Sequence, residues 1–436
     1  MTLASASTTI ASAKKEKPIR LGVIGVGRGQ SFMNSATEAL GLKLVAICDT
    51  WEEKLKEVGQ KHNVATYTDF DKMLEHDIDA VVLANYFHQH APFAIKALKA
   101  GKHVMSETAS CDTLAEGVEL CRTVEQTGLV YMLAENYPYT IFNQELRRIY
   151  RSGELGYAIY GEGEYNHPIS PDSPYWRRLA PTLNHWRNWL PATYYCTHAL
   201  APLMYMTDSM PVSVNALAIP WRDDDKDSRW LRRSDAASVT LCKMDDDSVF
   251  KLFGISCPGH SCWYRLHGSQ GAAEVERGPG YFGTQRVRVW HEEWQVPPGG
   301  VIDRTYSPNW PDHAELANKS GHGGGDFWTN FHFARAIRGI EPAYLDVYRG
   351  VAMSVVGAQS WRSALNNGTP FPIPDFKREE SRKAYENDHW SPFPDKPGEK
   401  APPSVRGLNE PRPEIVEQYM AKVEADRAGS TAAAKH

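Results

Sequence analysis

The sequence has no long apolar run, and this absence excludes one class of protein at the outset. No stretch approaches the roughly 18 apolar residues that a membrane-spanning helix needs. A strong net charge is also lacking, since 48 lysine and arginine residues stand against 53 aspartate and glutamate residues, a formal net charge of −5. A chain without excess positive charge is a poor partner for nucleic acid or an anionic membrane surface. We therefore expect neither partner.

Paired cysteine and histidine motifs are missing too. The seven cysteines form no CxxC pair, and Cys257 and Cys262 are too widely spaced for a typical zinc knuckle. An odd cysteine count in a large chain favours reduced thiols and a cytoplasmic setting. His167, His185 and His260 show no HExxH or comparable spacing, so no catalytic metal is expected.

The N-terminus has neither an apolar core nor twin arginines. Residues 1–17 are small and polar and then basic, so we interpret them as a disordered leader and not a signal peptide. A chain of 436 residues exceeds one ordinary core, which indicates more than one domain. The 13 tryptophans and 20 tyrosines suit a carbohydrate site, where sugars pack on rings, but filling a large core explains them equally well.

Apolar strands alternate with amphipathic helices between residues 18 and 137. The expected strands are Arg20–Gly25, Lys43–Asp49, Ala80–Ala84, His103–Glu107 and Leu129–Ala134. Helices are expected between them, including Trp51–His62 and Thr113–Thr127. Thr113 and Glu116 form a capping box at the start of the second helix, which would satisfy two unpaired N–H groups. The alternation predicts a parallel sheet covered on both faces, as in a Rossmann domain.

The pattern changes in residues 138–376, which we expect to form a second α/β domain. A helix (Tyr139–Ser152) leads into an alternating strand, Ala158–Asn166, and later strands have the spacing of antiparallel pairs. Those strands and the late helices are Ala236–Met244, Ser248–Phe253, Trp263–His267, Arg286–Trp290, Phe327–Arg338 and Val347–Asn366. Residues 377–436 are rich in proline and charge, and we expect an extended tail that wraps the surface or a partner subunit.

A glycine-rich turn follows the first expected strand, with Gly25, Gly27, Arg28 and Gly29. Glycines let the backbone turn tightly and approach a pyrophosphate at the N-terminus of the next helix. The spacing departs from GxGxxG because Gln30 stands at the last glycine position. Asp49 strengthens the prediction, since an acid after the second strand accepts hydrogen bonds from the ribose and repels a 2′-phosphate. No arginine immediately follows Asp49, so the sequence predicts NAD and not NADP.

Three further segments carry a resemblance, namely Asp79–His88, Gly101–Glu107 and Glu135-Asn136. In order and spacing they resemble the Gfo/Idh/MocA oxidoreductases. The resemblance implies an N-terminal Rossmann domain plus a C-terminal α/β domain with an open, mostly antiparallel sheet. Ordinary dehydrogenases of that group have a lysine after the glutamate, which assists proton transfer; this chain has Thr108. Loss of such a group usually costs about a hundredfold or more, which disfavours a plain sugar dehydrogenase.

With this departure, the chain is similar to glycoside hydrolase family 109, the NAD-dependent glycosidases typified by α-N-acetylgalactosaminidase. The resemblance runs from about Leu21 to Phe376, most of the chain. Its motifs are Glu107-Thr108, Ala134–Asn136 with Tyr139, Arg151–Gly156, Gly163–His167, His185–Arg187, Tyr195–His198 with Pro202, Gly321–Gly324 with Asp326, Leu345–Tyr348 and Ile373–Phe376.

The resemblance also implies a set of site residues. NAD contacts are expected from the glycine turn and from Asp49, Asn85, Tyr86, Phe87, His88, Glu107, Thr108, Asn136 and Arg187. Substrate contacts are expected from Tyr165, Tyr195, His198, Arg187 and His260. His260 stands where we align a substrate tyrosine of the family, so the sugar or its leaving group is expected to differ. A homodimer or homotetramer built on the open sheet face is also implied.

The implied chemistry recycles the cofactor. Oxidation at carbon three acidifies the proton on carbon two, elimination expels the anomeric group, water adds, and the hydride returns. His198 suits the first proton because imidazole titrates near neutrality. Tyr165 could take the second if a cationic or cofactor neighbour favours the phenolate. Tyr195 holds sugar hydroxyls with His198, and Glu135 orients these groups or protonates the leaving oxygen.

Each of these residues also has a plainer interpretation. Tyr165 on an alternating strand and His198 before an apolar stretch are ordinarily core residues, and His322 would cap the helix beginning near Asp326. Arg177, Arg178 and Arg187 are surface charge or an anion site, with solvated surface favoured for the first two.

Three functions remain in view. The first is an NAD-dependent glycosidase, and the second is a sugar or glycoside 3-dehydrogenase that releases NADH. The third, a non-catalytic dinucleotide sensor, is disfavoured because it has no use for the implied tyrosine and histidine pattern.

Overall fold

Two β-sheets organise the molecule, and the computed structural model describes residues 17–35, 38–168, 170, 172–222, 231–259 and 262–433. The first sheet has six parallel strands in the order β3-β2-β1-β4-β5-β6. Its strands are β1 (Ile19–Ile24), β2 (Leu42–Cys48), β3 (Ala65–Tyr67), β4 (Ala80–Leu83), β5 (His103–Ser106) and β6 (Tyr131–Leu133). This order is that of a Rossmann domain.

Helices cover both faces of this sheet, as the apolar strands require. They are α1 (Gly29–Ser35), α2 (Glu52–His62), α3 (Phe70–Leu74), α4 (His90–Lys99) and α5 (Leu114–Thr127). The expected capping box is only half formed. Thr113 Oγ1 accepts from Glu116 N, but the Glu116 carboxylate accepts from Asp112 N and not from Thr113 N. The side chain therefore satisfies the N–H of the residue before the N-cap.

The second sheet has nine strands in the order β14-β13-β12-β11-β7-β10-β9-β8-β15. Only β7 and β10 pair in parallel, so the sheet is mostly antiparallel. Its strands are β7 (Ala158–Asn166), β8 (Pro211–Ile219), β9 (Ala237–Met244), β10 (Val249–Ile255), β11 (Cys262–Gly268), β12 (Gly271–Val275), β13 (Val287–Trp290), β14 (Asp303–Tyr306) and β15 (Phe371–Pro372).

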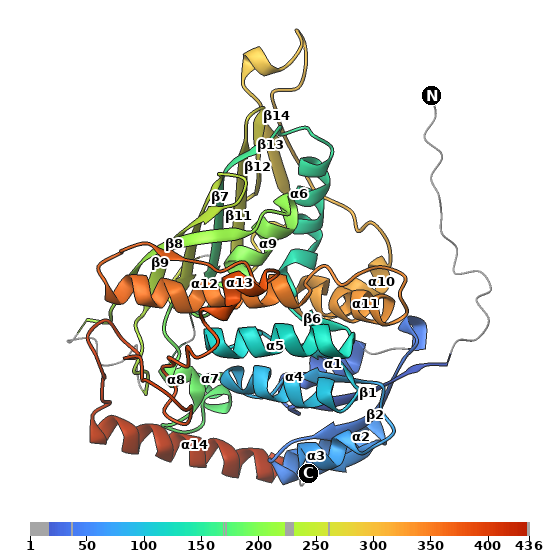
Figure 1. The fold of residues 1–436 in the computed structure, drawn as a ribbon, viewed down its shortest axis with the longest axis vertical. Helices are drawn as coiled ribbons and strands as arrows, with labels where there is room; N and C mark the ends of the chain where they lie inside the picture. The colour runs from blue at the N-terminus through green and yellow to red at the C-terminus, as the bar shows by residue number, and fades with distance from the viewer. Residues whose placement is uncertain are drawn as a thin grey trace.

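Three helices cover one face of the nine-stranded sheet, namely α6 (Ile141–Arg151), α9 (Thr197–Thr207) and α12 (Val347–Leu365). Figure 1 shows this layer above the Rossmann domain, with α12 and α11 (Gly325–Ile337) between the two sheets. The expected α/β fold class is confirmed. Strands β3, β8, β12 and β14 and helix α9 were not expected from the sequence. Strands β3, β12 and β14 have only three to five residues and carry little periodicity, and α9 is apolar on nearly every side.

The chain end differs from the expected extended tail. It contains α13 (Glu379–Lys383) and a long helix, α14 (Pro413–Ala433), which runs along the bottom of the molecule in Figure 1. Helix α14 packs against α7 (Pro174–Leu179), where Tyr419 and Trp176 meet in a small buried cluster. Arg177 Nε lies 2.6 Å from Asp426 in α14 and is 7% exposed. The sequence expectation of a solvated Arg177 is therefore wrong, whereas Arg178 is exposed.

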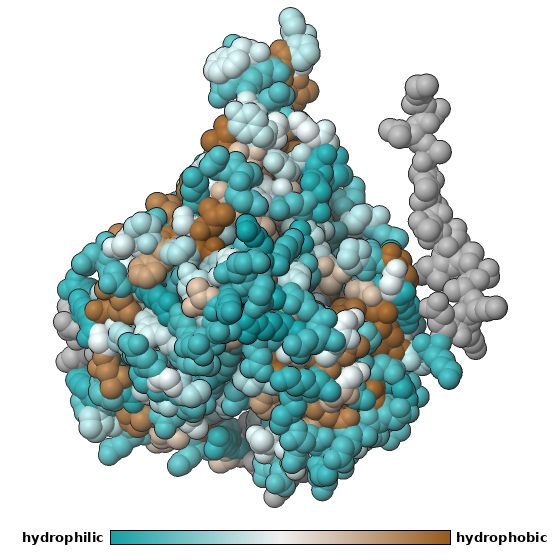
Figure 2. Space-filling model, in the orientation of Figure 1, coloured by the Kyte–Doolittle hydropathy of each residue, from teal (hydrophilic) through white to brown (hydrophobic). Residues whose placement is uncertain are grey.

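The surface in view is mainly hydrophilic, with scattered apolar areas (Figure 2). Among the described residues, no helix combines the length and the apolar character that crossing a membrane requires.

Tyr419 provides a test of how α14 is held. Its side chain is fully buried and its hydroxyl donates to Ala180 O at 3.0 Å. We expect Tyr419→Ala to weaken the docking of α14 by roughly 3 kcal/mol, since it removes a buried aromatic ring. Limited proteolysis should then cleave the basic residues of α14 sooner than in the wild type. The exposed neighbour Gln418→Ala is the control, and equal cleavage of the two variants would contradict the prediction.

Candidate active site

A buried carboxylate and an imidazole meet where the two parts of the chain join. Glu135 follows β6 and has no exposed surface, and His198 lies in the first turn of α9. His198 Nδ1 is 2.6 and 2.7 Å from the two Glu135 oxygens. An ionised carboxylate only accepts, so Nδ1 carries the proton and donates it. The lone pair of neutral His198 is then on Nε2, which suits proton abstraction.

Two further donors hold the Glu135 carboxylate in place. Thr108 Oγ1 donates to Oε2 at 3.1 Å, and Tyr137 N donates to Oε1 at 3.4 Å. Thr108 stands at the position where, by the resemblance described above, ordinary dehydrogenases of the Gfo/Idh/MocA group have lysine. Thr108 is buried, with 2% of its surface exposed. Its hydroxyl donates to Glu135 and so orients the carboxylate, but unlike lysine it supplies no positive charge.

Three tyrosine rings surround the His198 imidazole. The ring centroids of Tyr165, Tyr137 and Tyr195 lie 4.4, 4.4 and 4.9 Å from that of His198. The sequence-predicted trio of Tyr165, Tyr195 and His198 is therefore brought together. Burial raises the pKa of Tyr195 to about 12, and burial also raises the pKa of Tyr165 well above its usual value. Both phenols are therefore protonated at neutral pH, and each has an O–H group that can donate a hydrogen bond.

Sequence reasoning missed two members of this cluster. The Tyr137 hydroxyl lies 2.7 Å from the hydroxyl of Tyr281, which comes from the loop after β12. Tyr281 follows a glycine- and proline-rich turn that carries no periodic pattern, so nothing in the sequence singles it out. Tyr137 directly follows the Glu135-Asn136 motif and could have been included on that ground. His260 lies outside the described residues.

A second charged network lies beside the glycine turn. Arg28 Nε is 2.7 Å from Glu107 Oε1, and Arg28 Nη2 is 2.8 Å from Asp326 Oδ1. Asn136 Nδ2 also donates to Asp326, at 2.9 Å. Burial would raise the pKa of both carboxyls, but the Arg28 charge outweighs it and holds each pKa below its usual range. Asp326 belongs to a motif quoted above for the resemblance, but the sequence analysis assigned it no role.

His322 does not cap the following helix as the sequence suggested. The N-cap of α11 is Gly324, which makes no side-chain cap hydrogen bond. Instead, His322 Nδ1 lies 2.8 Å from Asp326 Oδ2, in the network just described.

The glycine turn has the shape that a dinucleotide requires. Gly25 has φ of +94°, and a Cβ at this position would stand 2.2 Å from Ala84 O. A Cβ on Gly27 would meet nothing within 4 Å, so the backbone there has an open side. Asp49 Oδ2 accepts from Val26 N at 2.8 Å, which ties the end of β2 to the turn.

Buried polar atoms without partners lie in the neighbouring segments. Within the described chain, both side-chain polar atoms of Asn85 and the Oδ1 of Asn136 are buried and unbonded. Such atoms are costly unless a ligand satisfies them. The open backbone at Gly27 therefore fits the phosphates of NAD, and the unbonded amides of Asn85 and Asn136 fit its amide. Gly25 and Gly29 are needed for close packing of the turn.

The other predicted cofactor residues face different surroundings. Tyr86 is 46% exposed, whereas Phe87 is buried and stacks on Trp186 at 5.4 Å and on Tyr195 at 6.2 Å. His88 Nε2 lies 2.9 Å from Asp395. The guanidinium of Arg187 lies 4.3 Å over the Trp186 ring.

Comparison with protein-family models identifies both parts of the chain. Residues 19–135 match the oxidoreductase family with an NAD-binding Rossmann fold, Gfo/Idh/MocA. Residues 232–383 match the glycosyl hydrolase 109 C-terminal domain. The chain joins a Gfo/Idh/MocA Rossmann domain to a glycosyl hydrolase 109 C-terminal domain. The expected resemblance is confirmed, and the cofactor of the Rossmann domain is NAD.

Curated relatives match over most of the length of the chain. A glycosyl hydrolase family 109 protein of Solibacter usitatus is 27% identical over 396 residues, which covers 84% of this chain and 90% of the relative. Glycosyl hydrolase family 109 protein 1 of Bacteroides fragilis is 26% identical over 399 residues, covering 83% and 85%.

Solved structures share the fold. A levoglucosan dehydrogenase in complex with NADH and L-sorbose has a TM-score of 0.69 at 19% identity, covering 83% of this chain and all of that one. An aldose-aldose oxidoreductase from Caulobacter crescentus has a TM-score of 0.64 at 18% identity, covering 82% and 100%.

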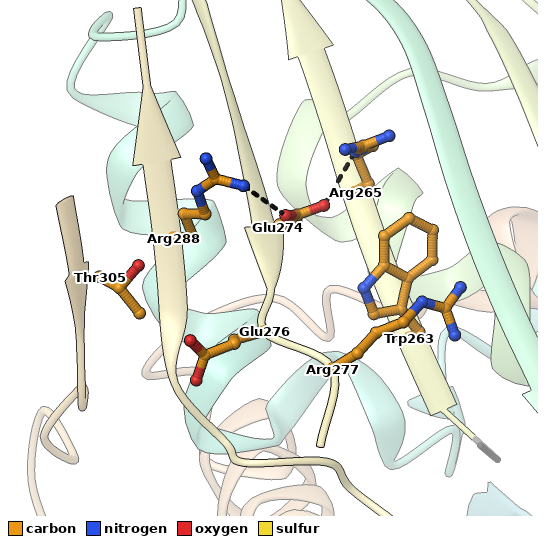
Figure 3. A pocket seen from close by; sticks show the side chains of 7 residues that line it. All are labelled: Trp263, Arg265, Glu274, Glu276, Arg277, Arg288 and Thr305. Carbon is orange, nitrogen blue, oxygen red and sulfur yellow. Dashed lines mark hydrogen bonds and ion pairs between the residues drawn. The ribbon is translucent and has the colours of Figure 1, made fainter. Parts of the chain in front are cut away.

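A surface hollow on the nine-stranded sheet is separate from this site. Trp263, Arg265, Glu274, Arg288 and their neighbours line it (Figure 3). Trp263 pairs with Glu164 in the sheet, whereas Tyr165 pairs with Cys262. Successive side chains of a strand point to opposite faces, so the hollow and Tyr165 lie on opposite sides of the sheet. Among the described residues, no group of three or more His, Cys, Asp or Glu side chains could hold a metal ion.

Paired glycine substitutions test the dinucleotide turn. We expect Gly25→Ala to lower the free energy of unfolding by at least about 2 kcal/mol, because a Cβ there is strained and collides with Ala84 O. Gly27→Ala should keep the wild-type melting temperature but bind NADH more weakly, because its methyl group fills the open side. Thermal unfolding and NADH fluorescence titration measure the two effects. Equal melting temperatures for both variants would show that the turn is not this tightly packed.

Proposed function

We propose that this protein is an NAD-dependent glycosidase that cleaves its substrate by transient oxidation at carbon three, elimination, water addition and re-reduction. The observation that carries the proposal is the buried Glu135–His198 pair, whose carboxylate is held by Thr108 at the usual lysine position. When bound beside the glycine turn, NAD would supply a hydride acceptor for the sugar and a hydride donor for the final reduction. The similarity to glycosyl hydrolase 109 proteins over most of the chain supports the same function.

His198 is the proposed base for the carbon-three hydroxyl. Its Nδ1–H is committed to Glu135, so Nε2 is the atom that accepts the proton. The Glu135 carboxylate then stabilises the imidazolium at 2.6 Å, as an orienting acid does behind a catalytic imidazole. The proton returns from Nε2 to the sugar oxygen in the last step. Glu135 is thus a positioning residue, and it is too deeply buried to protonate the leaving oxygen directly.

Tyr165 and Tyr195 are proposed to hold the sugar hydroxyls. Their rings stack at a centroid distance of 5.6 Å and both phenols are protonated, so each offers an O–H donor beside His198. The raised pKa of Tyr165 opposes its use as the carbon-two base, because no cationic side chain is among the groups that shift it. Donation by Tyr165 is therefore favoured over proton abstraction. His198 Nε2 then takes the carbon-two proton after it has released the carbon-three proton to solvent, and the leaving oxygen takes its proton from solvent.

The alternative function is a sugar or glycoside 3-dehydrogenase that releases NADH. The fold of levoglucosan dehydrogenase, which matches with a TM-score of 0.69, favours it. The same residues serve both reactions up to the ketone, and they differ only in whether the hydride returns.

A homodimer or homotetramer built on the outer face of the nine-stranded sheet is also proposed. Leu217 is 60% exposed and Leu241 is 45% exposed, and both lie on this face opposite the covering helices. A cytoplasmic setting is proposed because all seven cysteines are free and six are buried.

Nitrophenyl glycosides distinguish the two functions. We expect the purified chain, with no cofactor added, to release nitrophenol while the near-ultraviolet absorbance of NADH shows no net rise. Solvent deuterium should enter carbon two of the product, and Tyr165→Phe should retain that exchange. Stoichiometric NADH with an intact glycoside would establish the dehydrogenase instead.

Glu135→Gln tests the positioning role. The amide keeps the size of the side chain but cannot stabilise an imidazolium, so we expect kcat to fall by roughly a hundredfold or more. KM for the glycoside should change little, because Glu135 lies behind His198 and does not reach the sugar. Glu119→Gln, on the exposed side of α5, is the matched control and should keep wild-type kinetics. A rise in KM at unchanged kcat would contradict the assignment.

A further inference from the structure

Tyr281 reaches the site from the loop that joins β12 to β13. Gly280 and Gly283 turn this loop with φ of +89° and +59°, and Gly283 N donates to Gly280 O at 3.3 Å. Thr284 Oγ1 donates to Glu276 O at 3.1 Å, which closes the base of the loop. The half-buried ring of Tyr281 is therefore carried by a loop that is tied at its tip and at its base.

Ring contacts hold Tyr281 beside Tyr137 and Tyr165. Its neighbour Phe282 packs edge-on against it at 4.9 Å and lies 6.1 Å from the Tyr137 ring. The His167 ring lies 5.6 Å from Tyr281 and 6.1 Å from Tyr165, so it contacts both tyrosines. Tyr281 is thus packed from two sides against the tyrosines that surround the catalytic imidazole.

The hydroxyl groups of these three tyrosines meet. The hydroxyls of Tyr281 and Tyr137 are 2.7 Å apart, and the rings of Tyr137 and Tyr165 meet edge-on at 5.4 Å. Burial raises the pKa of Tyr165, and the neighbouring Tyr281 raises it further through its charge and a shared hydrogen bond. Burial also raises the pKa of Tyr137 and of Tyr281. All three phenols therefore keep their protons at neutral pH.

The hydrogen bonds within this tyrosine group leave one O–H group over. Each phenol has a single O–H donor and an oxygen that accepts. If Tyr137 donates to Tyr281 and Tyr281 donates to Tyr165, these two bonds use two of the three donors. The O–H of Tyr165 is then left to point at the sugar beside His198. Each hydrogen bond in such a chain polarises the next, which strengthens the last donor.

Removal of the carbon-two proton is the step that needs such a donor. When His198 Nε2 takes this proton, the electron pair of the broken C–H bond forms a double bond between carbons two and three. The carbonyl pair moves to the carbon-three oxygen, which becomes negative. The carbonyl then re-forms, the double bond shifts to carbons one and two, and the anomeric group leaves. A donor aimed at an oxygen that gains charge in this way lowers the barrier.

We propose that Tyr281 is a positioning residue for this step. Its O–H directs that of Tyr165 to the carbon-three oxygen and, together with Tyr137, strengthens this donor as the oxygen becomes negative. Tyr281 acts through Tyr165 and does not itself touch the sugar. The inference rests on the proposed function, whose elimination step it explains.

Tyr281→Phe tests this role, because it keeps the ring and removes only the hydroxyl. We expect the rate of deuterium entry at carbon two and kcat to fall roughly tenfold, the effect of losing about one hydrogen bond. KM should change little. Absorbance of bound NADH, recorded after rapid mixing of the NAD-loaded chain with a nitrophenyl glycoside, should rise at the wild-type rate, because the carbon-three oxygen is uncharged before and after oxidation. Tyr157→Phe, which removes an exposed hydroxyl, is the matched control.

A double variant shows whether Tyr281 acts through Tyr165. Tyr165→Phe should slow the deuterium exchange more than Tyr281→Phe does, and it should retain some exchange because His198 is the base. Adding Tyr281→Phe to Tyr165→Phe should cause no further loss, since the hydroxyl that Tyr281 orients is already gone. Losses that multiply in the double variant would contradict the assignment. Melting temperatures near the wild type would show that the variants are folded.

The outcomes separate this inference from the proposed function. Wild-type exchange by Tyr281→Phe would reject the inference and leave the glycosidase standing. An equal loss of oxidation and exchange would show that Tyr281 supports the site only by packing, and this would also overturn the assignment. Stoichiometric NADH without any exchange by the wild-type chain would reject the glycosidase, and the role of Tyr281 in elimination with it.

Discussion

The contact between Glu135 and His198 is the interaction on which the rest of the site depends. The carboxylate has no exposed surface, so its charge is tolerated only because three donors surround it. One donor belongs to the Rossmann domain, one to the backbone after β6, and one to α9 of the second domain. The pair therefore joins the two parts of the chain. Removing one partner would leave a buried charge without compensation.

A second interdomain network repeats this principle beside the glycine turn. Arg28 binds Glu107 in its own domain and Asp326 at the start of α11 in the other. Asn136 completes the link through Asp326. Because both networks cross the boundary between the sheets, the cofactor turn and the tyrosine cluster are held in one fixed relation.

The chain end contributes to the site through packing and not through chemistry. Helix α14 supports α7 through Tyr419 and Asp426, and α7 presents Trp176 to Arg232. The family model for the second domain ends at residue 383. Helix α7 is thus supported by a segment that lies beyond that match.

The sequence by itself determined the presence of two sheets and of the NAD turn, and it singled out Tyr165, Tyr195 and His198 in the central cluster but not Tyr137 or Tyr281. Alternating strands and helices require a covered parallel sheet, and Asp49 with the glycines indicates a dinucleotide whatever the later fold. The sequence did not determine partners that lie far apart along the chain, such as Asp326 for Arg28 and Tyr281 for Tyr137, because neither carries a periodic pattern. The capping of α5, the burial of Arg177 and the helix in the tail were likewise decided by tertiary contacts, which outweigh local propensity. Only the folded structure shows which arginines have a carboxylate and which do not, since that depends on which charges packing brings together.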